Sequence, residues 1–139
     1  MTRMLIVDDE PHIAAPLRER FEARGFEVSV AVDGEAGLAR IRQESPDVVL
    51  LDIMMPKLDG FGVLEKLREE GIDSTIIVLT AKTGSESAAR AIKLGAIDYL
   101  EKTVDSLRLE TTVRNALKDR TLRHELRPGA DVQRLGRLR

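Results

Sequence analysis

Short, mainly apolar runs alternate with longer amphipathic stretches along most of the chain. Each run has four or five residues, and the five runs lie at 4–7, 28–32, 48–51, 75–79 and 97–100. Apolar runs of this length, bounded by turn residues, are typical of strands that are buried in a sheet. The pattern therefore predicts five strands.

The stretches between and after these runs carry apolar residues at the spacing of a helix. We expect the following residues to face the core: Ile13, Leu17 and Phe21; Leu38 and Ile41; Phe61, Leu64 and Leu67; Ala88, Ala91 and Ile92; and Leu109, Val113, Ala116 and Leu117. Gly25, Gly71 and Gly95 each follow a helix, where a left-handed closing residue is favoured. The Ser45-Pro46 pair ends another helix. Because proline lacks a backbone donor, Pro16 predicts that the first helix bends or starts late.

The regular alternation of strand and helix predicts a parallel sheet with helices on both faces, which is a three-layer α/β sandwich. The first, third and fourth runs are continuously apolar, as strands buried on both faces are. The second run alternates (Val28, Val30, Val32), and Asp98 interrupts the fifth, so these two are predicted to be edge strands. The strand order 2-1-3-4-5 satisfies this requirement. In such a sheet the ligand site lies beyond the carboxyl ends of the first and third strands.

Acidic residues follow the two strands that should meet at this point. Asp8, Asp9 and Glu10 follow the first strand, and Asp52 follows the third. Two like charges about 4 Å apart repel by roughly 4 kcal/mol at an effective dielectric constant near 20, so the cluster needs a cation. The available ligands are hard oxygens, and the chain has no cysteine, which favours Mg²⁺ over zinc or copper.

Two further polar residues follow the remaining central and edge strands. Thr80 comes at the end of the fourth strand and Lys102 after the fifth. One Mg²⁺ and Lys102 would bring the charges of Asp8, Asp9 and Asp52 close to neutral. Each residue also has an ordinary interpretation: Thr80 as a strand former, Lys102 as a solvated charge, and Asp8 or Asp9 as a helix cap.

Other polar residues near the predicted site are given structural interpretations. The Asp59-Gly60 pair is predicted to be a turn and a helix cap, and no ligand role is expected for it. His12 is a single imidazole at the start of a helix and is predicted to face solvent. His124 lies in the basic tail, and no role is predicted for it.

The motifs at the strand ends together resemble the receiver domain (REC, CheY-like) of bacterial two-component response regulators. The resemblance covers about residues 3 to 120, and it is carried by Asp8-Asp9, by Asp52 with Pro56 four residues on and Asp59-Gly60 beyond, by Thr80-Ala81, and by Tyr99 three residues before Lys102. It implies a flavodoxin-like (βα)5 fold with a parallel five-stranded sheet of order 2-1-3-4-5.

The resemblance implies a phosphoacceptor and a metal site. Asp52 would accept a phosphoryl group from the phosphohistidine of a sensor histidine kinase or a phosphotransfer protein. The implied Mg²⁺ ligands are Asp9 directly, Asp8 largely through water, Asp52, and the backbone carbonyl of Met54. Lys102 would pair with a phosphoryl oxygen.

The resemblance also implies a conformational switch. Thr80 would donate a hydrogen bond to the phosphoryl group, and Tyr99 would turn inward into the space that Thr80 leaves. This changes the face formed by helix four, strand five and helix five, which would act on a downstream effector protein or domain and is a candidate homodimer surface. The alternative for Tyr99 is a half-buried strand aromatic whose hydroxyl stays in water.

The chain departs from the family pattern after Lys102. Receiver domains usually have a proline in a cis bond here, whereas this chain has Thr103. A cis bond before a residue other than proline costs roughly 2.5–4 kcal/mol, so we expect a trans bond. Met54 and Lys82, two residues beyond Asp52 and Thr80, are expected to affect the lifetime of the phosphoryl group.

Length and composition agree with a single receiver domain. The chain has 139 residues, of which 42% are hydrophobic, and it lacks both cysteine and an apolar N-terminal segment, so we expect a cytoplasmic protein without a membrane span. Residues 1–119 carry 16 basic and 22 acidic side chains, whereas residues 120–139 carry 6 basic and 2 acidic ones. We expect no direct nucleic-acid binding by this chain.

The domain boundary is predicted near residue 120. Residues 1–120 form the receiver domain, and residues 121–139 form an extension of helix five and a basic tail. Leu122 and Leu126 continue the apolar pattern before Pro128-Gly129 stops it. The extension is interpreted either as a linker to an effector domain or as a frayed amphipathic end.

Two other classes of protein, a phosphohydrolase and a pseudo-receiver, fit the sequence less well than a receiver does. A Mg²⁺-dependent phosphohydrolase that forms an aspartyl phosphate usually needs a second acid two residues after the nucleophile, and position 54 is Met. A pseudo-receiver that binds partners without phosphorylation is disfavoured because Asp9, Asp52, Thr80 and Lys102 are all present. We therefore expect no enzyme activity beyond phosphotransfer to this chain and its own dephosphorylation.

Overall fold

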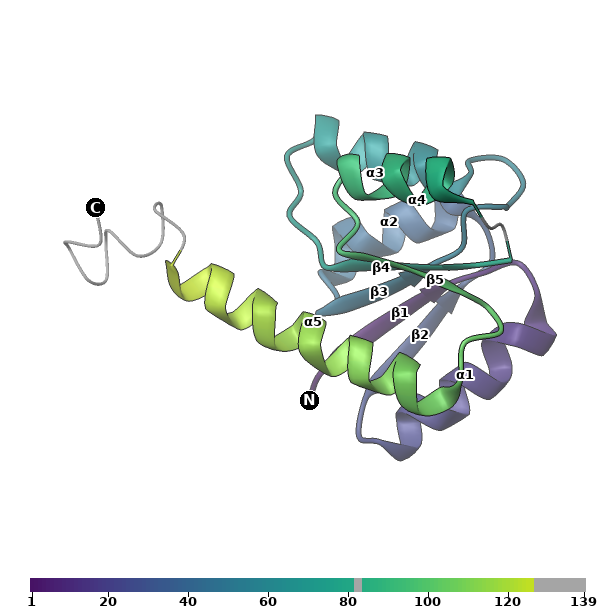
Figure 1. Cartoon of the computed structure of the whole chain (residues 1–139), viewed down its shortest axis with the longest axis vertical. Coiled ribbons are helices and arrows are strands. Elements are labelled where there is room, and N and C mark those ends of the chain that lie inside the picture. Colours follow the sequence, from purple (N-terminus) through teal and green to yellow (C-terminus); the bar gives the residue numbers. More distant parts are fainter. Residues whose placement is uncertain (82–83, 127–139) are drawn as a thin grey trace.

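The computed structural model of the chain describes residues 1–81 and 84–126. Strands and helices alternate through this part of the chain (Figure 1). Their bounds are β1 Arg3–Val7, α1 Pro11–Ala23, β2 Glu27–Ala31, α2 Gly34–Glu44, β3 Val48–Leu51, α3 Gly60–Glu69, β4 Ile76–Thr80, α4 Ser85–Lys93, β5 Asp98–Glu101 and α5 Ser106–Leu126.

The five strands form one parallel sheet in the order β2-β1-β3-β4-β5. This confirms the predicted order and the two predicted edge strands. The register pairs Val7 with Leu51 and Leu51 with Val78, so β1, β3 and β4 end at the same edge of the sheet. Residues that follow these strands therefore meet at that edge.

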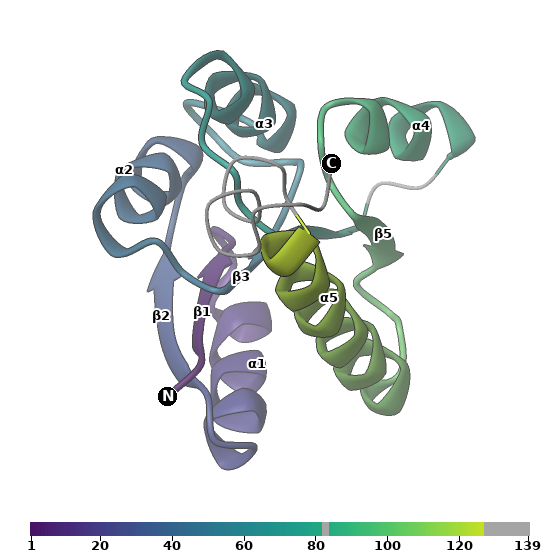
Figure 2. The ribbon, with the colours of Figure 1, turned by 90° about the vertical axis from the view of Figure 1, so that its left-hand side faces the viewer.

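The helices cover the sheet on both faces, as the three-layer prediction requires. α1 and α5 lie on one face, and α2, α3 and α4 lie on the other (Figure 2). Each face has its own core: Leu17, Phe21 and Val113 pack on the first, and Leu38, Val63 and others pack on the second. The central strands β1, β3 and β4 are buried on both sides, which explains their continuous apolar runs.

One predicted core position and one predicted strand end differ from the structure. Ile92 is 48% exposed, and of the residues of α4 only Ala91 is buried. Val32 is the predicted end of the second strand, but β2 ends one residue earlier, at Ala31, and Val32 is 60% exposed. β2 is an edge strand of the sheet.

The helix ends largely follow the predictions. Gly25, Gly71 and Gly95 have φ values of 92°, 70° and 114°, and Ser45 closes α2 with φ 47°. The predicted late start of α1 is wrong, because the helix begins at Pro11 and contains Pro16. Burial of one face of α1 against the sheet outweighs the missing backbone hydrogen bond.

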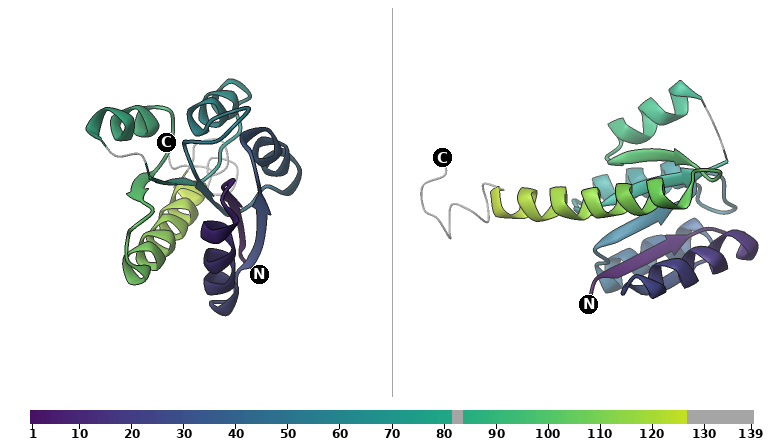
Figure 3. Two further views of the ribbon diagram at one scale, coloured as in Figure 1. Left: turned by 90° about the vertical axis from the view of Figure 1, so that its right-hand side faces the viewer. Right: turned by 60° about the horizontal axis from the view of Figure 1, so that its bottom comes forward.

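α5 continues without a break to Leu126 and projects beyond the sheet (Figures 1 and 3). Lys82 and the predicted helix stop at Pro128-Gly129 lie outside the described residues. Among the described helices, none combines the length and the apolar character that crossing a bilayer requires.

Candidate functional site

The site begins where β1 and β3 end side by side. The backbone N–H of Asp52 donates to the carbonyl of Val7 at 3.0 Å, and the N–H of Asp8 donates to the carbonyl of Ala31 at 3.0 Å. These hydrogen bonds continue the sheet one residue past its strands. They hold the Asp8 and Asp52 side chains next to each other at the carboxyl edge.

Four carboxylates gather at this edge. One oxygen from each of Asp8, Asp9, Glu10 and Asp52 lies within 4.8 Å of the others. Asp8 and Asp52 are 4% and 3% exposed, whereas Asp9 is exposed. Burying two unpaired charges would be costly, so the cluster needs a positive partner.

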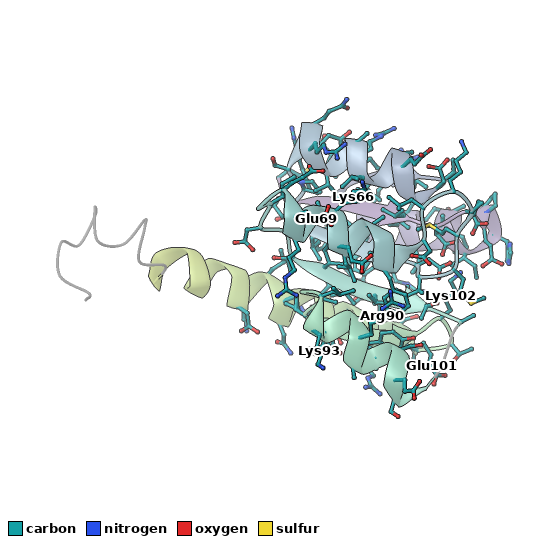
Figure 4. All side chains as sticks on the ribbon, turned by 90° about the horizontal axis from the view of Figure 1, so that it is seen from above. Lys66, Glu69, Arg90, Lys93, Glu101 and Lys102 are labelled. Carbon is teal, nitrogen blue, oxygen red and sulfur yellow. The ribbon has the colours of Figure 1, made fainter. Side chains whose placement is uncertain are left out.

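Lys102 is the positive partner within the described residues. Its Nζ lies 2.9 Å from Oδ2 of Asp52, 3.1 Å from Oδ2 of Asp8 and 2.6 Å from Oε1 of Glu10, and its side chain is 9% exposed. Lys102 lies at the end of the molecule opposite to the projecting end of α5 (Figure 4). The predicted convergence of the acids and Lys102 is thus seen in the structure.

The ionisation of these groups follows from their contacts. Burial lowers the pKa of Lys102, but hydrogen bonds to Glu10, Asp52 and Asp8 outweigh it and raise that pKa above its usual value. Burial raises the pKa of Asp8 despite its contacts with the Glu10 backbone and Lys102. The hydrogen bond from Lys102 lowers the pKa of Glu10. Lys102 is therefore charged at neutral pH.

The loop after β3 fixes the orientation of Asp52. The backbone N–H of Met54 donates to Oδ1 of Asp52 at 3.2 Å, which leaves Oδ2 to Lys102. A Cβ on Gly60 would lie 2.6 Å from the Asp52 carbonyl oxygen, so only glycine lets α3 start this close to the strand end. Asp59 caps α3 by accepting from the Gly62 N–H at 2.8 Å, as predicted.

The sequence profile of the response regulator receiver domain matches residues 4–114. This chain belongs to that family.

Known relatives agree with this assignment. The chain is 37% identical over 139 residues to the "Probable transcriptional regulator ycf27" of Porphyridium aerugineum, a match that covers 99% of this chain and 58% of that protein. The receiver domain of the Francisella response regulator 1452 superimposes with a TM-score of 0.81 at 34% identity, over 86% of this chain and 98% of that one. The BeF3-activated N-terminal receiver domain of Klebsiella pneumoniae RstA superimposes with a TM-score of 0.79 at 28% identity, over 84% of this chain and 98% of that one.

Two predicted switch residues of the receiver lie on β4 and β5. Thr80 is the last residue of β4 and is fully buried, and its carbonyl accepts from the backbone N–H of Lys102 at 2.9 Å. Tyr99 is half-buried against the core on the α4 side. Burial raises the pKa of its hydroxyl and outweighs the opposite effect of Ser87 of α4. This half-buried position is also the one that the alternative interpretation describes, and the inward turn of Tyr99 stays a prediction.

The loop after β5 departs from the family pattern as predicted. The peptide bond between Lys102 and Thr103 is trans. Lys102 nevertheless reaches Asp52, so the trans bond does not remove it from the receiver site. His12 is exposed, as predicted, and its Nε2 lies 3.7 Å from Oε2 of Glu10.

Glu10 is the member of the cluster that the predicted site set omits. Its contact with Lys102 joins residues that are 92 positions apart in the chain. The run Asp8-Asp9-Glu10 carried a signal, because three successive acids follow one strand. The spacing alone does not indicate which of the three side chains turns toward the fifth strand.

Proposed function

We propose that this receiver domain accepts a phosphoryl group on Asp52 and passes the signal to a downstream partner. The observation that carries the proposal is the setting of Asp52. Its carboxylate is buried at the meeting point of two strands, with Lys102 at 2.9 Å and three further acids beside it. A buried carboxylate with a fixed cation and a cluster of hard oxygen ligands suits phosphoryl transfer.

Mg²⁺ is the proposed cofactor. The oxygens of the acidic cluster lie within 4.8 Å of one another, which fits a small hard cation, and the chain offers no sulfur ligand from cysteine. Asp9, Asp52, Asp8 and the backbone carbonyl of Met54 would hold it. When bound, Mg²⁺ neutralises charge on the phosphoryl oxygens.

The proposed donor is a phosphohistidine of a sensor histidine kinase or a phosphotransfer protein. A carboxylate oxygen of Asp52 attacks phosphorus, an O–P bond forms, and the N–P bond breaks with its electron pair returning to the imidazole. Lys102 then donates a charge-assisted hydrogen bond to one phosphoryl oxygen, and the Thr80 hydroxyl donates to another.

The proposed output is a change in the face formed by α4, β5 and α5. The phosphoryl group adds a charge of about −1.5 to −2 beside Thr80 and β5. Tyr99, which now contacts Ser87 of α4, would turn inward as Thr80 moves. α4 buries only Ala91, so a shift of this helix breaks few contacts. Reversing a 1:99 population ratio takes about 5.5 kcal/mol, which a few charge-assisted hydrogen bonds can supply.

The partners are part of the same proposal. The chain spans 58% of the Porphyridium relative, whose name describes a probable transcriptional regulator. We propose that the switched face acts on an effector domain or protein and forms a homodimer in some states, without direct nucleic-acid binding by this chain.

Incubation with acetyl phosphate and Mg²⁺, followed by intact mass measurement, tests the function. We expect the mass of one added phosphoryl group in the wild type, and its loss in Asp52→Asn and after chelation of Mg²⁺. Glu19→Gln, a change to an exposed acid on α1, serves as the control and should be phosphorylated normally. Repeated turnover of many phosphate esters would instead indicate a phosphohydrolase, and an unmodified wild type would indicate a pseudo-receiver.

A further inference from the structure

Glu10 is fixed at the start of α1 so that its side chain faces the site. Its backbone N–H donates to Oδ1 of Asp8 at 2.9 Å. Its carbonyl accepts from the N–H groups of Ile13 and Ala14, each at 3.0 Å. The residue stands at the N-cap position, but its side chain does not cap α1. The carboxylate is instead used for a contact with Lys102.

The contact between Glu10 and Lys102 is the shortest of the three that the ammonium makes. Oε1 of Glu10 lies 2.6 Å from Nζ, compared with 2.9 Å for Asp52 and 3.1 Å for Asp8. Glu10 is also the most exposed of the three carboxylates, with 44% of its side chain accessible. It therefore approaches Lys102 from the open side of the site, where a phosphoryl donor has to enter.

The charge balance gives Glu10 a different role from the other acids. Asp8, Asp9 and Asp52 together are neutralised by Lys102 and one divalent cation. Glu10 adds one more negative charge, which is not needed to balance the charge of the cation. This charge repels an incoming phosphoryl group. A phosphoryl oxygen and the Glu10 carboxylate would also need the same ammonium, because Lys102 has three donor hydrogens and already serves three carboxylates.

We propose that Glu10 is a positioning residue that holds Lys102 in the resting receiver and competes with the phosphoryl group for its ammonium. This inference rests on the proposed phosphorylation of Asp52. Glu10 opposes the phosphorylated state, and the receiver stays in its resting state until a donor delivers the phosphoryl group. Releasing Lys102 from Glu10 is one step of activation.

The test measures the affinities of Glu10→Gln for Mg²⁺ and for beryllofluoride, a phosphoryl mimic, by calorimetry on the full chain. The proposal predicts opposite signs. Mg²⁺ should bind more weakly, because a nearby negative charge is lost, whereas beryllofluoride at saturating Mg²⁺ should bind more tightly. We expect the gain to be about twofold to fivefold, the range of one partly exposed ion pair. The rate of phosphorylation by acetyl phosphate should rise in the same range.

Two further variants separate contact from charge. Glu10→Asp keeps the charge but shortens the side chain by one methylene, so beryllofluoride affinity should rise above that of the wild type. Glu19→Gln makes the same charge change on an exposed part of α1 and should leave both affinities unchanged. Unaltered far-ultraviolet circular dichroism checks the fold of each variant.

A spectroscopic readout reports on the contact itself. The ¹⁵N signal of the Lys102 ammonium, assigned with Lys102→Arg, should exchange slowly with water in the wild type and faster in Glu10→Gln. Unchanged exchange would show that Glu10 does not hold Lys102 and would overturn the proposal. A beryllofluoride affinity that falls together with that for Mg²⁺ would show that Glu10 is a metal ligand and would also overturn it. If the wild type binds no beryllofluoride and accepts no phosphoryl group, the function of the site fails as well. If the wild type binds beryllofluoride and accepts a phosphoryl group, but the Glu10 variants have the same affinities as the wild type, the proposed function stands and the proposed role of Glu10 fails.

Discussion

At the scale of single residues, the receiver site depends on a few positions where the backbone comes very close to itself. Gly60 is one such position, because the start of α3 touches the backbone of Asp52 and Ile53, just after β3. Gly34 is another, since a Cβ there would lie 1.8 Å from the carbonyl oxygen of Leu58. Both contacts hold the loop that carries Met54 against the neighbouring elements. Asp52 is therefore oriented by glycines as much as by its charged partners.

Gly60→Ala should lower the free energy of unfolding by about 1–3 kcal/mol, the usual cost of overpacking a filled site. The new Cβ would lie 2.6 Å from the Asp52 carbonyl oxygen and 2.7 Å from Cα of Ile53, and these are backbone atoms that cannot turn away. Urea unfolding measures the change. Gly62→Ala is the matched control, since its Cβ meets the flexible end of Leu58. Equal stability of the two variants would contradict the prediction.

At the scale of elements, the helices differ in how firmly they are attached. α3 buries five residues, among them Phe61, Leu64 and Leu67, whereas α4 buries only Ala91. The guanidinium of Arg90 lies 4.1 Å from the centroid of the Phe61 ring and joins α4 to α3 (Figure 4). The helix next to Tyr99, the proposed switch residue, is thus held mainly at its surface, which suits an element that moves.

An ion pair between Arg42 of α2 and Glu70, the C-cap residue of α3, gives a pH prediction. Arg42 donates to both carboxylate oxygens of Glu70, and this hydrogen bonding lowers the pKa of Glu70 below 4.5. A lowered folded-state pKa contributes stability that is present above the unfolded value and is lost as the pH falls through the folded value. Glu70→Gln should therefore be slightly less stable than the wild type at neutral pH.

The difference between Glu70→Gln and the wild type should shrink as the pH falls below 4.5. Both residues are largely solvated, so the effect should be small and should weaken with added salt. Unfolding midpoints measured across pH check the prediction. A difference that persists unchanged in acid would show that Glu70 acts through packing.

At the scale of the whole molecule, the carboxyl edge of the sheet concentrates negative charge that folding must bring together. Asp8, Asp9, Glu10 and Asp52 share this edge with one lysine, Lys102, as their contacting cation among the described residues. The two hydrophobic cores on either side of the sheet offset the free-energy cost of the repulsion between these charges. The acidic cluster that would hold the proposed Mg²⁺ therefore lowers the stability of the fold.

Mg²⁺ should raise the thermal midpoint of unfolding, because it binds the folded cluster and not the unfolded chain. A concentration 100-fold above the dissociation constant adds about 2.7 kcal/mol. Asp9→Asn should be more stable than the wild type in a chelator, since like-charge repulsion falls, and should lose most of the Mg²⁺ effect. Thermal melts with and without Mg²⁺ measure both. An unchanged Mg²⁺ effect in Asp9→Asn would remove Asp9 from the proposed ligands.

The sequence by itself determined the strands, their order and the edge at which the site lies. Parallel strands that are buried on both faces have continuous apolar sequences, so they can be recognised without the structure. Their carboxyl ends lie at one edge of the sheet, so Asp8, Asp52 and Lys102, which each follow a strand, could be predicted to lie close together. The roles that the family resemblance implies for these residues remain proposals.

Only the tertiary structure decided how the side chains share the site and which helix faces are covered. Glu10 contacts Lys102, which lies 92 positions further along the chain, and no local sequence pattern predicts this contact. Ile92 is exposed on α4, where only Ala91 is buried, and α1 starts at Pro11 although it contains Pro16. Periodicity states which residues share a face of a helix, whereas burial and charge pairing depend on what the rest of the chain places against that face.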